Sequence, residues 1–361
     1  MKTITKQLAA TLLVSTFSLA AHAVGINFDG GEVPGCDDGS DSLPVAQRAN
    51  HDDGTYYCDG AAGDLTYDIY IASGFTVKMN DGENPLNAAS AILGANGKLE
   101  GNLNSASTVA MGAGATINGD VKSGTTVAMG VEAVVTGNTN LNDRLNAPHD
   151  DGTNLAIYAG STLALGANAT VDGAVQAVTT IAVGAEGLVE GNVYAGTTVA
   201  LGANSHVIGL VNAGTTVALG AESDVTGNVK AGTTVALGAD SHVVGNVEST
   251  TSTVTLGVNS YVTGTTEALI AGVTLGAGAY ACETVEAVTA TLGAGSFVRG
   301  ELLATTMTVA AGSIVTGHMD GTTATLGANA CYGSISATTI TLGAGAGLCG
   351  TPTLPANDCP L

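Results

Sequence analysis

An octapeptide that returns at a short, fixed interval constrains this chain more than any other feature. Ala195–Gly202 reads Ala-Gly-Thr-Thr-Val-Ala-Leu-Gly and recurs at Ala213–Gly220 and at Ala231–Gly238, a period of 18. We use the residue after the Leu as the marker of each unit. Markers lie 18 residues apart in the first half of the chain, except for one gap of 36, and then 16 to 19 residues apart. The fourteen markers are Gly94, Gly112, Gly130, Gly166, Gly184, Gly202, Gly220, Gly238, Gly257, Gly276, Gly293, Ala310, Gly327 and Gly343. A short fixed period is typical of a solenoid, in which each unit is one coil that becomes stable only by stacking on its neighbours.

Apolar and polar residues alternate within each unit. Val199 and Leu201 precede the marker glycine, and Val207 and Val211 follow it. This alternation predicts short strands with one buried face, and the glycines between them predict sharp bends. The absence of Trp and the presence of only 13 Phe or Tyr suit a narrow interior filled by Val, Leu and Ala. We therefore predict an all-β fold, a single-stranded β-solenoid with three short strands in each turn, about 16–19 residues per turn and about 14 turns.

The two ends of the chain differ from the repeat. Two lysines in Met1–Lys6, the apolar run Leu8–Ala20 and the sequence Ala21-His22-Ala23 predict a signal peptide over residues 1–23, and hence a periplasmic, cell-surface or extracellular protein. We expect an acidic N-terminal cap region over 24–86, the solenoid over 87–350 with an insertion loop at about 138–160, and a tail over 351–361. No later stretch has the length and apolarity of a transmembrane segment.

Six cysteines lie near the two ends of the chain: Cys36, Cys58, Cys282, Cys331, Cys349 and Cys359. In an exported protein they are candidates for disulfides, with fifteen possible pairings, and the paired short spacings of a zinc site are absent. The formal charge of −22, with only nine Lys and Arg, argues against a nucleic-acid partner, because little positive charge is present to neutralise phosphates.

The run Val225–Gly238, which reads V-T-G-N-V-K-A-G-T-T-V-A-L-G, resembles the repeat of bactofilins. The resemblance covers about residues 90–350. It implies a right-handed triangular β-helix that polymerises end to end without nucleotide, so that the chain would be its own partner. The regular units also fit the hexapeptide pattern of left-handed β-helices, but the drift to spacings of 16, 17 and 19 favours the right-handed form. Bactofilins are typically cytoplasmic or membrane-associated, so the export signal means that a cytoskeletal role does not follow from the resemblance.

Stacked coils place residues of equal offset in columns along the solenoid. Thr stands four residues before the marker in twelve of fourteen units, and the position two before it changes from mostly Ala to Thr in each of the last six. The resulting Thr-x-Thr pairs form a candidate surface-binding grid: Thr253, Thr255, Thr289, Thr291, Thr306, Thr308, Thr323, Thr325, Thr339 and Thr341. Flat threonine arrays are used by ice-binding β-solenoids, and these turns resemble those of the secreted bacterial ice-binding family. Thr is also an ordinary strand residue that stacks well on itself, so the grid fits a purely structural role as well.

Another column, four residues after the marker, becomes aromatic in the late units. Tyr261, Tyr280, Phe297 and Ile314 follow one another on successive turns. By parity we expect an exposed aromatic stripe that binds sugar rings or packs against a neighbouring copy. Coverage by the tail 351–361 is an equal alternative.

Two further patterns bear on metal binding. His206 and His242 stand in that same column with Asp224 between them, but two turns, or about 9–10 Å, separate the histidines, so we interpret them as solvated surface residues that do not share a metal. The motif His-Asp-Asp-Gly-Thr occurs at His51–Thr55 and His149–Thr153 and could supply oxygen ligands to Ca²⁺ or form plain Asp-Gly turns.

No catalytic motif accompanies the repeat. GxSxG, HExxH and CxxC are all absent, so we predict neither an enzyme nor a resident cofactor. Our leading hypothesis is an exported structural β-solenoid that self-assembles into extracellular or cell-surface filaments, with itself or an extracellular matrix or surface as partner. Ice binding through the threonine grid, and adhesion or carbohydrate binding through the aromatic stripe, are the alternatives.

Overall fold

A computed structural model describes residues 25–30, 36–37, 54–58, 67–79, 85–137 and 155–350. These residues form an all-β, parallel β-solenoid of about 15 turns and contain no helix, which confirms the fold class predicted from the repeat. The chain divides into two compact units: the first comprises Met1–Gly173 with Ala182–Gly187, and the second comprises Ala174–Ile181 with Leu188–Leu361. The predicted signal peptide and C-terminal tail lie outside the described residues.

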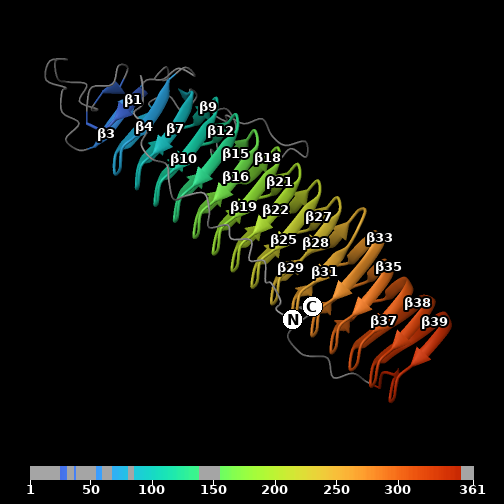
Figure 1. Cartoon of the computed structure of the whole chain (residues 1–361). Coiled ribbons are helices and arrows are strands. Elements are labelled where there is room, and N and C mark those ends of the chain that lie inside the picture. The colour runs from blue at the N-terminus through green and yellow to red at the C-terminus, as the bar shows by residue number, and fades with distance from the viewer. Residues whose placement is uncertain are drawn as a thin grey trace, which may run out of the picture. The chain divides into compact units, whose positions relative to one another are not determined.

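Strands of two to five residues make up the first unit (Figure 1). They are β1 (Gly25–Phe28), β2 (Cys36–Asp37), β3 (Thr55–Cys58), β4 (Asp68–Ile71), β5 (Thr76–Met79), β6 (Leu86–Ala88), β7 (Ser90–Leu93), β8 (Lys98–Glu100), β9 (Leu103–Ser105), β10 (Thr108–Met111), β11 (Thr116–Asn118), β12 (Val121–Ser123), β13 (Thr126–Met129), β14 (Val134–Thr136), β15 (Leu155–Ala159), β16 (Thr162–Leu165) and β17 (Thr170–Asp172), while β19 (Thr180–Val183) divides between the units.

Parallel pairing in the first unit begins before residue 87, where we expected the solenoid to start. β1 pairs with β4 and β4 with β7 in one stack, β5 pairs with β8 in a second, and β6 pairs with β9 in a third, all in parallel. Each coil therefore contributes one rung to each of three stacks of strands, as the triangular prediction requires. The expected insertion falls between β14 and β15. Val121 pairs with Leu103, one period earlier in the sequence, but on its other side it pairs with Ile157, two periods later, so one extra period of sequence lies between these two coils. β15 itself lies within the range 138–160 that we expected to be loop.

The second unit is also built of three-strand coils, and its strands become longer toward its C-terminal end (Figure 1). Its strands are β18 (Ala174–Ala177), β20 (Leu188–Glu190), β21 (Val193–Ala195), β22 (Thr198–Leu201), β23 (His206–Ile208), β24 (Val211–Ala213), β25 (Thr216–Leu219), β26 (Asp224–Thr226), β27 (Val229–Ala231), β28 (Thr234–Ala236), β29 (His242–Val244), β30 (Val247–Ser249), β31 (Val254–Leu256), β32 (Tyr261–Val262), β33 (Thr266–Leu275), β34 (Tyr280–Ala281), β35 (Val285–Leu292), β36 (Phe297–Val298), β37 (Leu302–Val309), β38 (Ile314–Leu326), β39 (Cys331–Leu342) and β40 (Gly347–Leu348).

The register of the second unit reproduces the sequence period. Val199 pairs with Val217, one full period along the chain, and Val235 pairs with Val254, one position beyond a full period. The spacing between paired residues later falls, as when Val285 pairs with Leu302 and Cys331 pairs with Gly347. Like residues therefore stack on like residues. Alternate side chains point inward, so that Val199, Val217 and Val235 are fully buried in a continuous aliphatic core.

A recurring corner follows each marker glycine. In the second unit the residue two after the marker has a positive φ, for example 55° at Asn204 and 55° at Glu222. The next residue is a fully buried serine in several coils, and its hydroxyl donates a 2.8 Å hydrogen bond to the marker's carbonyl, as Ser205 does to Gly202. The corner thus satisfies its own buried hydroxyl while turning the chain onto the next face.

Candidate functional site

The candidate threonine grid lies on one face of the second unit, in register across successive coils. Its first column stacks Thr255, Thr274, Thr291, Thr308, Thr325 and Thr341 through paired Cα positions, and all six are exposed. Thr274 was outside the predicted pairs, because Gly272 stands where its partner threonine would be, yet the structure places it in the column. We refer to the predicted ten residues together with Thr274 as the threonine face.

The second column of the threonine face runs parallel to the first. Thr289, Thr306, Thr323 and Thr339 stack in register, and Gly272 pairs with Thr289 at the position that interrupts the column. Thr289, Thr306 and Thr339 are exposed, whereas Thr253 and Thr323 are half-buried. The residues between the columns point inward, so the two columns form a two-dimensional array of hydroxyl and methyl groups.

The threonine face combines regular spacing with the absence of charge. Threonines repeat at about 4.8 Å from coil to coil and at roughly 6.6 Å from one column to the other, which are the ordinary spacings of a β-sheet. The six strand segments that carry the face, within residues 252–256, 271–275, 288–292, 305–309, 322–326 and 338–342, contain no charged residue, although the chain carries 31 Asp and Glu. Acidic side chains are thus excluded from this surface.

Charged side chains gather instead on another stack of strands. Glu248, Glu267 and Glu286 occupy successive rungs, and Lys230 pairs with the first of them at 2.8 Å. Burial raises the pKa of the Glu267 carboxyl, and the adjacent carboxylates of Glu286 and Glu248 raise it further. The stacking of these carboxylates on successive rungs therefore carries an electrostatic cost.

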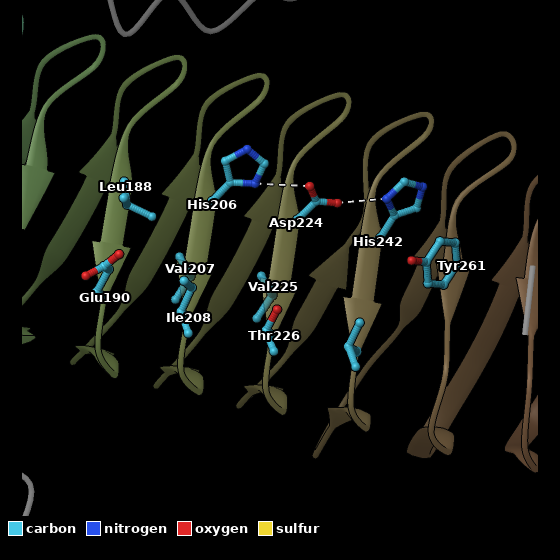
Figure 2. A pocket seen from close by; sticks show the side chains of 11 residues that line it. Leu188, Glu190, His206, Val207, Ile208, Asp224, Val225, Thr226, His242 and Tyr261 are labelled. Atoms are coloured by element: carbon cyan, nitrogen blue, oxygen red, sulfur yellow. Dashed lines mark hydrogen bonds and ion pairs between the residues drawn. The ribbon is translucent and has the colours of Figure 1, made fainter. Parts of the chain in front are cut away.

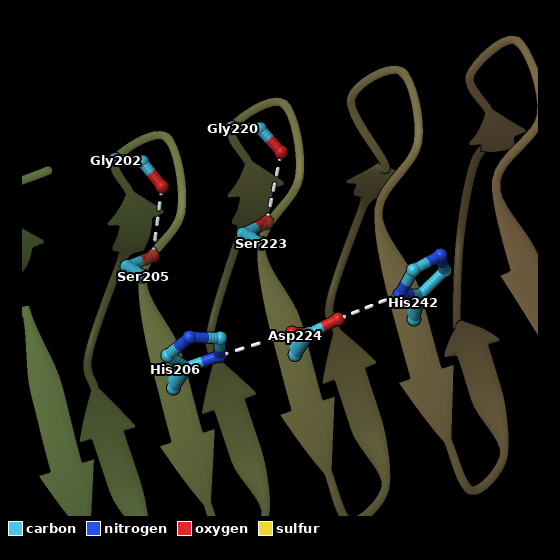
Figure 3. A network of polar contacts seen from close by, with 7 residues as sticks. All are labelled: Gly202, Ser205, His206, Gly220, Ser223, Asp224 and His242. Atoms are coloured by element: carbon cyan, nitrogen blue, oxygen red, sulfur yellow. Dashed lines mark hydrogen bonds and ion pairs between the residues drawn. The ribbon is translucent and has the colours of Figure 1, made fainter. Parts of the chain in front are cut away.

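His206, Asp224 and His242 form a polar network on the remaining stack, where we expected separate solvated residues. The Nδ1 of His242 is hydrogen-bonded to one carboxylate oxygen of Asp224 at 2.7 Å, and the Nδ1 of His206 makes an ion-pair contact with the other oxygen at 3.0 Å (Figures 2 and 3). The His242 ring also stacks on Tyr261, with centroids 4.1 Å apart. The sequence predicts that these three residues stand in one column, but it does not predict the side-chain conformations that bring them into contact. A shallow groove of about 450 Å³ surrounds the network.

The aromatic stripe is not the exposed surface that parity suggested. Phe297 is only 4% exposed, and Tyr261 and Tyr280 are half-buried. Phe297 lies in register between Tyr280 and Ile314, and the Tyr280 and Phe297 ring centroids are 5.9 Å apart, so neighbouring side chains cover its faces. The expectation of exposure was therefore wrong for Phe297.

Disulfides tie strands near both ends of the described chain. Cys36 pairs with Cys58 within the antiparallel β2–β3 contact, and Cys331 pairs with Cys349 on the next rung. Cys282 is also disulfide-bonded, and Cys359 lies outside the described residues. Stable disulfides are typical of oxidising compartments and are consistent with export. Within the described ranges, no helix has the length and apolarity to cross a membrane.

The described residues contain no recognisable metal-binding site. Among the described residues, no cluster of three or more His, Cys, Asp or Glu is arranged to hold a metal ion. His149–Thr153 and His51–Asp53 of the His-Asp-Asp-Gly-Thr motifs lie outside the described residues, so calcium binding by these motifs stays a prediction.

The last described coil leaves one edge of the sheet unpaired. β39 pairs with β38 along its length, but on its other side β40 covers only Cys331 and Tyr332 among the described residues. Ile340 and Leu342 are 42% and 47% exposed, although their counterparts one coil earlier, Ala324 and Leu326, are buried. An unpaired strand edge flanked by exposed apolar side chains favours association with another chain.

Comparison with known proteins does not extend the two sequence resemblances: no protein-family model, no curated protein and no solved structure matches this chain.

Proposed function

We propose that this protein is an exported, non-enzymatic β-solenoid that binds ice through the threonine face. The observation that carries the proposal is the in-register column of six exposed threonines, accompanied by a second column on the same uncharged surface. Ice offers a partner that is itself periodic and uncharged. A rigid sheet can hold hydroxyls and methyls at a repeat close to that of water molecules in ice, so ordered water on the face can join the lattice with little further loss of entropy.

Inhibition of ice recrystallisation tests this proposal. The intact protein should inhibit recrystallisation at micromolar concentration, and Thr308→Tyr, at the middle of the first column, should lower its potency by about tenfold or more, equivalent to about 1.4 kcal/mol. Thr226→Tyr is the matched control, because Thr226 is an exposed strand residue on a different stack. An inactive intact protein, or equal losses in both variants, would contradict the proposal.

We propose as a second candidate function self-association through the edge of β39 that is left unpaired by the described residues, which would make the protein a structural element of a larger assembly. The exposed Ile340 and Leu342 support this candidate, because a second copy could both pair the strand edge and cover these side chains. Its occupant is thus a second copy of this chain, as the bactofilin resemblance implies.

Light scattering and electron microscopy test self-association. The intact protein should form dimers or filaments, and Leu342→Glu should release monomers. Val288→Glu is the control, because Val288 is similarly exposed at 42% but lies away from the β39 edge. Monomers of the intact protein at high concentration would exclude this candidate.

A further inference from the structure

The groove around Asp224 lies on a different stack of strands from the threonine face. β20, β23, β26, β29 and β32 supply its walls and floor, on five consecutive coils (Figure 2). Figure 2 shows one row of side chains with His206, Asp224 and His242 and a second row with Ile208 and Thr226. The groove volume of about 450 Å³ lies within the range of small-ligand sites.

The floor of the groove is set by the shortest side chains. Asp224 and Thr226 share the central coil, and the coils on either side carry a histidine together with a branched aliphatic residue. Ile208 is 53% exposed and Val244 is 45% exposed. A ligand resting on the central coil would therefore meet polar groups below it and an imidazole and an aliphatic group on each side.

The hydrogen-bond network prepares these polar groups for a ligand. Both imidazoles direct Nδ1 toward Asp224, His242 in a hydrogen bond and His206 in an ion-pair contact, and this leaves each Nε2 directed away from the carboxylate. Neither Nε2 has a partner among the described residues. Each Asp224 oxygen contacts one imidazole, and a carboxylate oxygen has two lone pairs, so the carboxylate can still accept a hydrogen bond from a ligand hydroxyl.

We propose that this groove binds a neutral, hydroxyl-rich saccharide. Neighbouring hydroxyls of a sugar can donate hydrogen bonds to the carboxylate of Asp224 and can donate to or accept from the imidazoles beside it. The exposed side chains of Ile208 and Val244 can contact the C–H groups of a pyranose ring. The carboxylates of Asp224 and Glu190 disfavour sulfated or uronate glycans through like-charge repulsion. Stacking on Tyr261 contributes little, because His242 already covers one face of that ring.

Binding to immobilised neutral oligosaccharides tests the proposal. The probes are hexasaccharides of β-1,4-glucan, β-1,3-glucan, α-1,4-glucan and β-1,4-mannan, together with a sulfated and a uronate oligosaccharide, all measured in the presence of a metal chelator. At least one neutral probe should bind the intact protein. Asp224→Ala should weaken that binding by about tenfold or more.

Two variants keep the test specific to the groove. Asp320→Ala removes an exposed aspartate from another stack of the same unit and should leave binding unchanged. His206→Ala removes one wall, at a side chain that is 51% exposed, and should also weaken binding. The proposal is overturned if no neutral probe binds in chelator, if only acidic probes bind, or if Asp320→Ala weakens binding as much as Asp224→Ala does.

Discussion

Gly232→Ala should destabilise the second unit strongly, because the coils at this corner stack too closely for a side chain. A Cβ added to Gly232 would lie 1.9 Å from the carbonyl oxygen of Gly214, whereas ordinary contact begins near 3.4 Å. The two coils would have to separate by more than 1 Å. This shift would strain the hydrogen bonds from Gly232 N to Ala213 O, at 3.0 Å, and from Thr233 N to Thr215 O, at 2.8 Å. At about 1 kcal/mol for each bond, plus lost packing, we expect a loss of about 2–4 kcal/mol.

Urea unfolding followed by circular dichroism measures this loss. Gly347→Ala is the matched control, because no atom of the described residues lies within 4 Å of an added Cβ there and the backbone is not left-handed. We expect the control to change stability by less than about 0.5 kcal/mol and Gly232→Ala to lower the urea midpoint clearly. Equal midpoints for the intact protein and Gly232→Ala would refute the close stacking of coils.

Three further substitutions test the core, the acidic column and the extent of the threonine face. Thr266→Val should stabilise the fold by about 1–2 kcal/mol in the same assay, because the buried Thr266 hydroxyl has no hydrogen-bond partner among the described residues and because Val247 and Val285 occupy its position on adjacent coils. Lower stability of this variant would contradict this reasoning. Glu267→Gln should raise the melting temperature at pH 7. The raised pKa of Glu267 means that its ionisation opposes folding as pH rises above its ordinary value of 4.5, so the gain should vanish below that pH, and a gain that persists there would refute the cause. Ala236→Thr, which adds a threonine on the rung next to Thr255, should increase inhibition of ice recrystallisation, and unchanged or lower activity would count against the array.

The repeat predicted the coil well because the residues that fix its bends and its buried positions are close in sequence and recur on every turn. The marker glycine, the alternating valines and the nearly constant spacing each reflect the same geometry, so that Val199 stacks on Val217 as the period of the sequence requires. The first coils were harder to find. β4 and β5 are ordinary strands of the stack, but Asp68–Met79 lacks the marker motif, and the neighbouring acidic residues made it look like a separate cap.

Side-chain contacts within a column were less predictable than the column itself. Register alone placed His206, Asp224 and His242 in line, but the Asp224 side chain spans the distance to both rings, which the spacing of Cα atoms does not reveal. Phe297 shows the opposite error. Parity directs it outward, yet a large ring between large neighbours is covered by them and becomes buried. Disulfide pairing likewise depends on which rungs meet, so fifteen possible pairings stayed open until the stack was known.

Uptake of the protein into a slowly growing ice hemisphere tests directly whether the threonine face binds ice. Ice that grows slowly rejects solutes but retains proteins that bind its surface. The intact protein and Thr226→Tyr should become enriched in the ice fraction, while Thr308→Tyr should remain in the liquid. Exclusion of the intact protein from the ice, or equal uptake of both variants, would show that the threonine face is not an ice-binding surface.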